Sequence, residues 1–404
     1  MKKVLIINTS DANGGAAVVS HRLMSAMRKE GIDARMLVVD KRSDDENVAV
    51  AGIPEQYKWA FYGERLRIWL NNGFSKKQLF KVSTADRGVD VMSHPWVKSA
   101  DVVILNWINQ GMMSLYEIRQ LCKSGKEVLW TMHDMWCLTG ACHHAYGCEN
   151  YKDKCEYCQF MKASHRKSLA SKTWKIKKAL YQEYPIKFVV VSEWLAQRCK
   201  ESSLLADQSV TVIPNTMPIS SYQYTQEETP KKKQIVMGAA RLDDPVKGFD
   251  LMIEAMNEIA DNYPDIAEHL RLVLFGNLRD TSKLKELRLD CKWMGPVTVD
   301  QLNDIYRSCD VVLSSSHFET FGATLVEGMA SGCKCVAFNH GGQSDIIDDG
   351  KNGFLAEYPS TDSLAECVIK ALDLFVSRED LHRQAEEKFS EKSVVRKYID
   401  LIKK

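Results

Sequence analysis

The chain has 404 residues, of which 45% are hydrophobic and 26% are charged, and its formal net charge is +1. This length fits two domains better than one, and the apolar fraction is sufficient for two buried cores. A net charge near zero predicts no general affinity for nucleic acid, and no apolar run approaches the roughly 18 residues that a membrane-spanning helix needs.

The N-terminus leads from Met1-Lys2-Lys3 directly into a short apolar strand. This apolar stretch is too short for the core of a signal peptide, so we expect a cytoplasmic protein. In a reducing compartment most of the twelve cysteines would be thiols or metal ligands rather than disulfides.

Apolar runs alternate with helical patterns through the first half of the chain. Strands are expected at residues 4–7, 35–39, 102–106, 127–132, 188–191 and 210–213. Helices are expected between them, for example at residues 16–29 and 115–124. Strands that alternate with helices predict a parallel sheet, so this half reads as a doubly wound α/β domain.

Two polar sites in this half follow expected strands. Gly14 and Gly15 open the first helix, where glycines let the backbone approach a phosphate closely, although the dinucleotide spacing G-x-G-x-x-G is absent. His133 follows the strand at 127–132 and precedes Asp134, which could orient the histidine ring or cap the next turn. Either site could also be purely structural.

The Cys-rich loop, residues 137–158, is the most unusual local feature. Four of its cysteines are separated by five, six and two residues: Cys142, Cys148, Cys155 and Cys158. Four thiolates at these spacings can surround a structural zinc ion, with His143 or Cys137 as substitute ligands. Free thiols and disulfides remain the alternatives.

Two stretches of the first half combine cations with aromatic residues. Residues 161–180 hold Trp174, seven lysines and arginines, and no acidic residue. In residues 57–81 aromatic side chains interleave with cations that include Arg65, Arg67, Lys76, Lys77 and Lys81. Basic helices with aromatic side chains can lie on anionic lipid, but many are solvated helix faces. Contact with a membrane surface is therefore one of two interpretations.

The alternation resumes after a polar linker at residues 220–233. Strands are expected at residues 235–239, 272–275, 311–313, 335–338 and 354–356. Helices are expected at residues 249–261, 299–308, 321–330 and 363–375. This pattern predicts a second doubly wound domain.

Two cations follow the first strand of this second domain. Arg241 and Lys247 would lie at the carboxyl end of a parallel strand, where open α/β sheets bind ligands. Arginine offers a planar fork and lysine a point charge, a combination that suits a pyrophosphate. Two solvated loop charges are the alternative.

Glu319 and Glu327 stand eight residues apart, just after another expected strand. Eight residues is slightly more than two helical turns, so both carboxylates would lie on one face of a helix or just before it. Unpaired N–H groups at the helix start would suit a phosphate, and the carboxylates could accept hydrogen bonds from sugar hydroxyls. The helix start comprises Thr320, Phe321 and Gly322. These features predict a nucleotide-sugar site.

Together these motifs resemble retaining glycosyltransferases of family four, which have the GT-B fold. Five motifs in the family's order carry the resemblance: the first strand with its glycine loop, residues 212–215, Arg241 with Lys247-Gly248, the Glu319 to Glu327 spacing, and the glycine pair 341–342. Three positions depart from the family's usual residues: Thr320, Gly328 and Asp345. These departures weaken an inference of donor specificity more than an inference of fold.

The resemblance implies an α/β protein of two Rossmann-like, doubly wound domains that face a cleft. Residues 1–218, with the Cys-rich loop, would bind the acceptor. Residues 219–385 would bind the nucleotide-sugar donor. Residues 386–404 would form a helix that packs back on the N-terminal domain.

The resemblance also implies how the leaving group is stabilised. Arg241, Lys247 and the helix start at residues 320–322 would bind the departing diphosphate, which accumulates negative charge. No Asp-x-Asp motif stands in a suitable loop, so the resemblance implies no cofactor for catalysis.

The remaining site residues take their implied roles from the same resemblance. His133 would contact the donor sugar near its reacting carbon, and the loop of Gly14 and Gly15 would face the donor diphosphate. Glu319 would hold hydroxyls of the transferred sugar, and Glu327 would hold the ribose.

The implied function is a retaining transfer of a sugar from a UDP- or GDP-linked donor. A glycan or polyprenyl-linked acceptor in surface polysaccharide biosynthesis fits this function, with the protein in the cytoplasm at the inner face of the membrane. The alternatives are an epimerase or glucan phosphorylase-like enzyme of the same fold, or a non-catalytic protein that binds sugar nucleotides.

Overall fold

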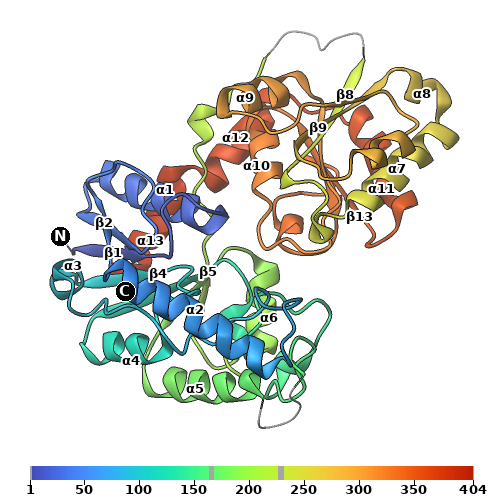
Figure 1. Cartoon of the computed structure of the whole chain (residues 1–404). Helices are drawn as coiled ribbons and strands as arrows, with labels where there is room; N and C mark the ends of the chain where they lie inside the picture. Colours follow the sequence, from blue (N-terminus) through green and yellow to red (C-terminus); the bar gives the residue numbers. More distant parts are fainter. Residues whose placement is uncertain (1, 163–167, 226–231, 404) are drawn as a thin grey trace. The chain divides into compact units, whose positions relative to one another are not determined.

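The computed structural model describes residues 2–162, 168–225 and 232–403. They form two compact units (Figure 1). Unit 1 comprises Met1–Thr216 with Val395–Lys404, and unit 2 comprises Met217–Val394. The sequence-based boundaries lie at 218/219 and 385/386. The centre of the expected linker, residues 226–231, lies outside the described residues.

The described residues of unit 1 contain a seven-stranded sheet in which every pairing is parallel. Its strands are β1 (Val4–Ile7), β2 (Ala34–Val38), β3 (Val48–Val50), β4 (Val102–Leu105), β5 (Glu127–Met132), β6 (Lys187–Val190) and β7 (Val210–Val212). The order is β3-β2-β1-β4-β5-β6-β7. The direction of winding therefore reverses between β1 and β4, and the carboxyl ends of these two strands mark the expected place for a ligand.

The helices of unit 1 connect these strands. They are α1 (Gly15–Lys29), α2 (Pro54–Asn71), α3 (Pro95–Ser99), α4 (Leu115–Lys123), α5 (Leu169–Glu183), α6 (Glu193–Glu201) and α13 (Glu391–Lys403). α4 begins with a capping box, in which Ser114 and Glu117 satisfy each other's backbone N–H groups. On α13, the Tyr398 hydroxyl lies 2.9 Å from Thr131 Oγ1, so this C-terminal helix packs within unit 1.

Unit 2 contains, among its described residues, a six-stranded sheet that is also parallel throughout. Its strands are β8 (Lys233–Arg241), β9 (Leu270–Asn277), β10 (Cys291–Trp293), β11 (Val311–Ser314), β12 (Lys334–Phe338) and β13 (Gly353–Ala356), in the order β10-β9-β8-β11-β12-β13. Its helices are α7 (Phe249–Asn262), α8 (Pro264–Glu268), α9 (Val299–Ser308), α10 (Ala323–Ala330), α11 (Thr361–Asp373) and α12 (Arg378–Phe389).

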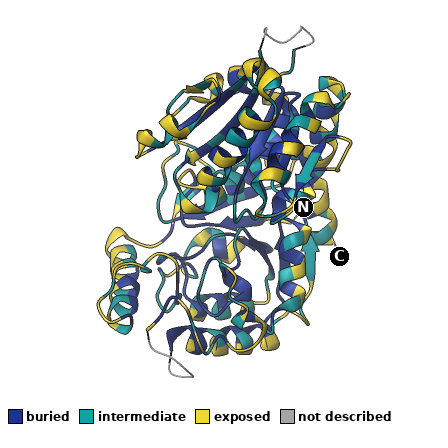
Figure 2. Ribbon diagram, turned by 90° about the vertical axis from the view of Figure 1, so that its right-hand side faces the viewer, coloured by how far each residue is buried: buried dark blue, intermediate teal, exposed yellow. Residues whose placement is uncertain are grey.

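The central strands of both sheets are buried, and the exposed residues lie mainly on the helices and loops (Figure 2). Every residue of β1, β4 and β11 is buried, as expected for parallel strands that helices cover on both faces. The predicted doubly wound α/β fold is confirmed for both units. No helix in the described part of the chain is long and apolar enough to cross a membrane.

Candidate functional site

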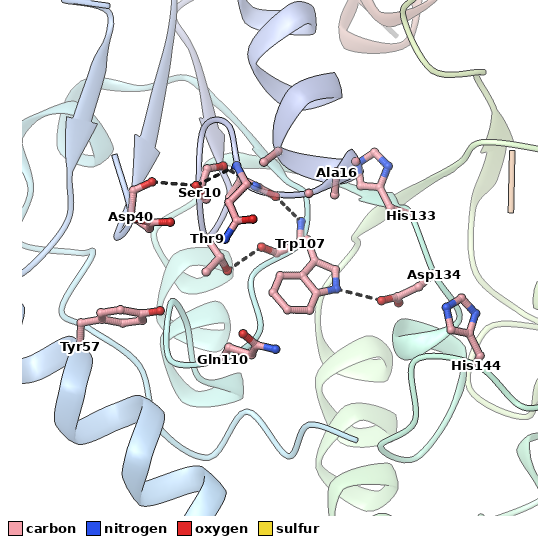
Figure 3. Close-up of a pocket in the computed structure, with 15 residues that line it drawn as sticks. Thr9, Ser10, Ala16, Asp40, Tyr57, Trp107, Gln110, His133, Asp134 and His144 are labelled. Carbon is pink, nitrogen blue, oxygen red and sulfur yellow. Dashed lines mark hydrogen bonds between the residues drawn. The ribbon is translucent and has the colours of Figure 1, made fainter. Parts of the chain in front are cut away.

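A cavity of about 400 Å³ lies at the carboxyl ends of β1, β4 and β5 in unit 1 (Figure 3). Its walls come from the loops after these strands, the start of α1, α2 and the Cys-rich loop, and they include Asn8, Thr9, Ser10, Gly14, Gly15, Asp40, Tyr57, Trp107, Gln110, His133, Asp134 and His144. The cavity thus occupies the point where the strand order reverses, which is where this fold class binds ligands.

Hydrogen bonds between two loops hold one side of this cavity. Thr9 Oγ1 donates to the Trp107 carbonyl at 2.8 Å, and the Trp107 N–H donates to Asn8 Oδ1 at 2.8 Å. The loops after β1 and β4 are therefore fixed to each other before any ligand binds.

The start of α1 presents its backbone to the cavity. Gly14 precedes the helix with φ 94°, and no side chain caps the first turn. A Cβ atom on Gly14 or Gly15 would meet no heavy atom within 4 Å, so packing does not demand glycine there. The backbone conformation accounts for Gly14, and the open space around both residues leaves the α1 N-terminus accessible to an anionic group.

His133 is held at the carboxyl end of β5 by Asn106. Its Nε2 lies 2.7 Å from Asn106 Oδ1, and since the amide oxygen accepts, Nε2 carries the proton. Burial lowers the pKa of His133 to about 4, although the charge of Asp134 acts in the opposite direction. The ring is therefore neutral at physiological pH and suited to hydrogen bonding rather than to carrying a charge.

Asp134 joins the cavity wall to the Cys-rich loop. Its Oδ2 accepts hydrogen bonds from Trp107 Nε1 at 2.9 Å and His143 Nδ1 at 2.7 Å, and its Oδ1 accepts from the Trp136 N–H at 2.8 Å. Burial alone would raise the pKa of Asp134, but the interactions with His143, His144 and the Trp136 N–H together outweigh burial and lower this pKa to about 2. Of the two roles considered for Asp134, the structure shows the turn cap.

In unit 2 the structure brings Lys247 and Glu319 together. Lys247 Nζ lies 2.7 Å from Glu319 Oε2, although 72 positions separate the two residues. The carboxylate charge raises the pKa of Lys247, so the pair is ionised at neutral pH. This contact joins the loop after β8 to the loop after β11, at the carboxyl ends of neighbouring strands.

Gly248 makes this close approach of the two loops feasible. Its φ is 62°, and a Cβ atom would lie 2.0 Å from the Ser315 carbonyl oxygen. The His317 N–H also donates to the Val246 carbonyl at 2.8 Å. The Lys247-Gly248 motif therefore combines a cation with the residue that lets its loop contact the loop of Glu319.

Arg241 lies at the end of β8 in ion pairs within its own loop. Its Nη2 lies 3.0 Å from Asp244 Oδ2, and its Nε lies 3.4 Å from Asp243 Oδ1. The Arg241 side chain is about one-third exposed, so part of it remains accessible to a ligand.

The helix after Glu319 begins two residues later than expected, at Ala323. Gly322 precedes it in a left-handed conformation, φ 102°, which the preceding turn requires. The Glu319 carbonyl accepts from the Gly342 N–H at 2.7 Å, so the glycine pair supports this loop. Phe321 is buried, and its ring packs against Phe389 at a centroid distance of 5.7 Å.

Glu327 lies in the second turn of α10. Its Oε2 accepts a hydrogen bond from the Tyr306 hydroxyl at 3.2 Å. Tyr306 is fully buried, so the carboxylate has a fixed partner on the side facing the protein.

The four cysteines of the predicted zinc site line one small cavity in unit 1. They are free thiols rather than disulfides. Among the described residues, no three His, Cys, Asp or Glu side chains stand in an arrangement that would already ligate a metal. His143, considered as a substitute ligand, is hydrogen-bonded to Asp134.

Two cations counted in the basic stretches are not on the surface. Arg65 is buried beside Glu64, with Nη2 2.5 Å from Glu64 Oε2, and Lys177 is fully buried in α5. The interpretation of both as exposed membrane-facing charges is wrong, because periodicity alone does not show which helix face is covered. Arg166 and Lys167 lie outside the described residues.

Several cavity residues were not predicted from the sequence, among them Asn8, Asp40, Tyr57, Trp107 and His144. A signal existed for some of them. Asn8 and Trp107 directly follow expected strands, so the rule that ligands bind at strand carboxyl ends could have indicated them.

Residues 223–388 match the family model described as glycosyl transferases group 1. Among curated relatives, mannosylfructose-phosphate synthase of Agrobacterium fabrum is 29% identical over 147 residues, covering 34% of this chain and 32% of the relative. The lipopolysaccharide 1,2-N-acetylglucosaminetransferase of Salmonella typhimurium is 26% identical over 208 residues, covering 46% and 53%. The chain thus spans between about a third and a half of the length of these relatives.

Solved structures extend the likeness over the whole chain. Sucrose-phosphate synthase from Thermosynechococcus elongatus has a TM-score of 0.66 at 15% identity and covers 100% of this chain and 98% of its own. The Anabaena protein HepE, in complex with UDP and glucose, has a TM-score of 0.62 at 15% identity, with both chains covered completely. These likenesses show the GT-B fold, and the match over residues 223–388 assigns that part of the chain to the glycosyl transferases group 1 family.

Proposed function

We propose that this protein is a retaining glycosyltransferase that moves a sugar from a nucleoside-diphosphate donor to a glycan or polyprenyl-linked acceptor in surface polysaccharide biosynthesis. The contact between Lys247 and Glu319 carries the proposal, because it joins two strand-end loops inside the region that matches the family. The UDP and glucose bound by HepE support a nucleotide-sugar donor.

In this proposal, unit 2 holds the donor by its phosphates. Breaking the anomeric bond leaves negative charge on the departing diphosphate, and Arg241, Lys247 and the N–H groups before α10 stabilise that charge. Glu319, anchored by Lys247, accepts hydrogen bonds from hydroxyls of the transferred sugar. Glu327, held by Tyr306, accepts hydrogen bonds from the ribose hydroxyls.

His133 acts on the sugar as a neutral group. Its lowered pKa keeps the ring uncharged, so it hydrogen-bonds to a hydroxyl near the reacting carbon without repelling the positive charge that develops on the sugar. The cavity beside it is lined by hydroxyl, amide and carboxylate groups, which supports a hydroxyl-rich acceptor. The loop of Gly14 and Gly15 presents backbone N–H groups to a donor phosphate.

The surface of α2 supports a lipid-linked acceptor and contact with the inner face of a membrane. Four large apolar side chains, each more than half exposed, follow one another at helical spacing: Trp59, Tyr62, Leu66 and Leu70. The opposite face buries the charged pair Glu64 and Arg65. An apolar stripe facing outward, with exposed Lys58, Lys76 and Lys77 nearby, suits an anionic lipid surface.

Ligand binding followed by product analysis tests the function. Thermal unfolding with UDP- and GDP-linked sugars identifies the donor, because a ligand that binds only the folded state raises the melting temperature. We expect one nucleotide class to raise the melting temperature of the wild type. Glu327→Ala should reduce this rise, whereas Glu366→Ala, a control on an exposed helix face, should retain it.

The product then separates the alternatives. An acceptor glycoside with the donor's anomeric configuration, observed by NMR, supports retaining transfer, and an inverted product contradicts it. Sugar phosphate formed from a glucan and inorganic phosphate would indicate a phosphorylase, and an isomerised sugar nucleotide would indicate an epimerase. Binding without turnover would indicate a non-catalytic sugar-nucleotide protein.

A further inference from the structure

The four cysteines of the Cys-rich loop share a small cavity in unit 1. Cys142, Cys148, Cys155 and Cys158 line a space of about 20 Å³, together with apolar side chains that include Phe160. A cavity needs on the order of 10–15 Å³ to hold one water-sized occupant, so this one has room for a single small guest. Three separate parts of the loop thereby place four cysteines around one cavity, where a modest movement would let their sulfur atoms converge on one ion.

The backbone next to this cavity already contacts a sulfur atom. The Gly140 N–H donates a hydrogen bond to Cys155 Sγ at 3.2 Å. A Cβ atom on Gly140 would lie 2.8 Å from the Cys155 Cβ and 2.7 Å from the Ala170 carbonyl oxygen, so only glycine permits this approach. Sulfur accepts hydrogen bonds more strongly as a thiolate than as a thiol, and such donors support metal-bound ligands.

A buried cation lies beside the same thiols. Lys177 is fully buried, and its Nζ donates to the carbonyl oxygens of Trp136 at 2.6 Å and Thr139 at 3.1 Å. Its electrostatic interactions are with thiols, including Cys142 and Cys155, and with Asp134. Nζ also lies 3.3 Å from the centroid of the Trp136 ring, which is a cation–π contact.

Burial lowers the pKa of Lys177 to about 7, so a nearby negative charge would stabilise its charged form. A buried ammonium group is costly unless an anion compensates it. Asp134 already supplies one negative charge in this region, and neutral thiols or disulfides would add none. Four thiolates around a divalent ion carry a formal charge of −2, and Lys177 would offset part of that charge.

We propose that Cys142, Cys148, Cys155 and Cys158 bind one zinc ion as thiolates, with Lys177 as the buried counter-charge of the site. Binding draws the four sulfur atoms to one centre, releases their protons and leaves no open coordination position, so the ion is structural. The inference goes beyond the proposed transferase activity and does not depend on it.

The site would also fix part of the cavity described above. The Cys-rich loop carries His143, which bonds Asp134, and His144, which lines the cavity. Zinc would therefore act as a positioning element. It would hold His144 in the cavity wall and, through His143, would hold Asp134.

Metal analysis tests the proposal. We expect about one zinc per chain in protein purified under reducing conditions without chelators, measured by elemental analysis. The double variant Cys155→Ser/Cys158→Ser should lose the zinc, whereas Cys291→Ser in unit 2 should retain it. Absence of zinc from the wild type, or its retention by the double variant, overturns the proposal.

A spectroscopic measurement decides the question even if the double variant does not fold. The wild type reconstituted with Co²⁺ should show thiolate-to-metal charge-transfer absorption and the intense visible bands of a tetrahedral site. In competition with a chelator, Lys177→Met should lower the affinity for zinc by about tenfold or more. This is the scale expected for a group that lies beside metal ligands without binding the metal itself. Absence of the cobalt bands, or these cysteines found as disulfides by mass spectrometry, also overturns the proposal.

Discussion

The candidate sites of the two units differ in how their charges are arranged. In unit 2, the cations Lys247 and Arg241 are each paired with carboxylates at short range. In unit 1, the cavity centres on a neutral histidine and a carboxylate whose partners are two ring N–H groups and one backbone N–H group. The comparison teaches that one parallel-sheet architecture can carry paired charges at its strand ends in one unit and a largely neutral, hydrogen-bonded cavity in the other, because different loops supply the side chains.

Removal of Lys247 should produce the largest effect. It disrupts the charged site of unit 2 and leaves the cavity of unit 1 unchanged. Lys247→Ala should lower kcat for sugar transfer by about 10²- to 10³-fold, the scale of one lost charge-stabilising donor. The exposed control Lys370→Ala should keep wild-type activity. Near-normal turnover by Lys247→Ala would remove this lysine from the proposed mechanism.

A glycine substitution tests how much the close approach of two loops in unit 2 contributes to stability. Gly248→Ala should destabilise the protein by about 1–3 kcal/mol or more, because the methyl group meets the Ser315 carbonyl and the backbone is left-handed. Gly350→Ala is the matched control, since Gly350 has φ 75° but open space around a Cβ atom. Urea unfolding of both variants separates the effect of the Ser315 contact from that of backbone strain. Equal losses in the free energy of unfolding would show that the loop contact contributes little.

The two faces of α2 allow a test confined to unit 1. Leu66→Ser/Leu70→Ser should reduce binding to anionic vesicles by about 30-fold, since two partly inserted leucines are each worth on the order of 1 kcal/mol. Melting temperature should change little because both side chains are exposed. Tyr116→Ser, which removes a still more exposed apolar side chain from α4, is the control. Unchanged sedimentation of the leucine double variant with vesicles would argue against this membrane face.

The smallest expected effect is a pH dependence from His133. Its folded pKa of about 4 lies below the ordinary 6.5, so the unfolded chain binds more protons between these values. Its contribution to stability should be complete above pH 6.5 and should decline as pH falls towards 4. Chemical unfolding of wild type and His133→Gln across this range should give a smaller slope for the variant, and identical slopes would contradict the lowered pKa.

The sequence predicted more residues of the candidate site in unit 2 than in unit 1, and the reason is physical. Arg241, Lys247, Glu319 and Glu327 lie in two short motifs, each beside a strand whose apolar run is easy to recognise. In unit 1 the cavity collects residues from separate loops, and Trp107 and His144 carry no motif that would associate them. The predicted helix at 299–308 was confirmed, while α10 began later because Gly322 adopts a left-handed turn.

Local sequence by itself determined the alternation of strands and helices, the glycine turns and the polar ends of the strands. These features depend on hydrophobic periodicity and on backbone conformational freedom within a few residues. Only the tertiary structure decided that Lys247 contacts Glu319, that Arg65 and Lys177 are buried, and that four cysteines share one cavity. Which face of a helix is covered, and which distant loops meet, depends on packing across the whole unit, and no local pattern contains that information.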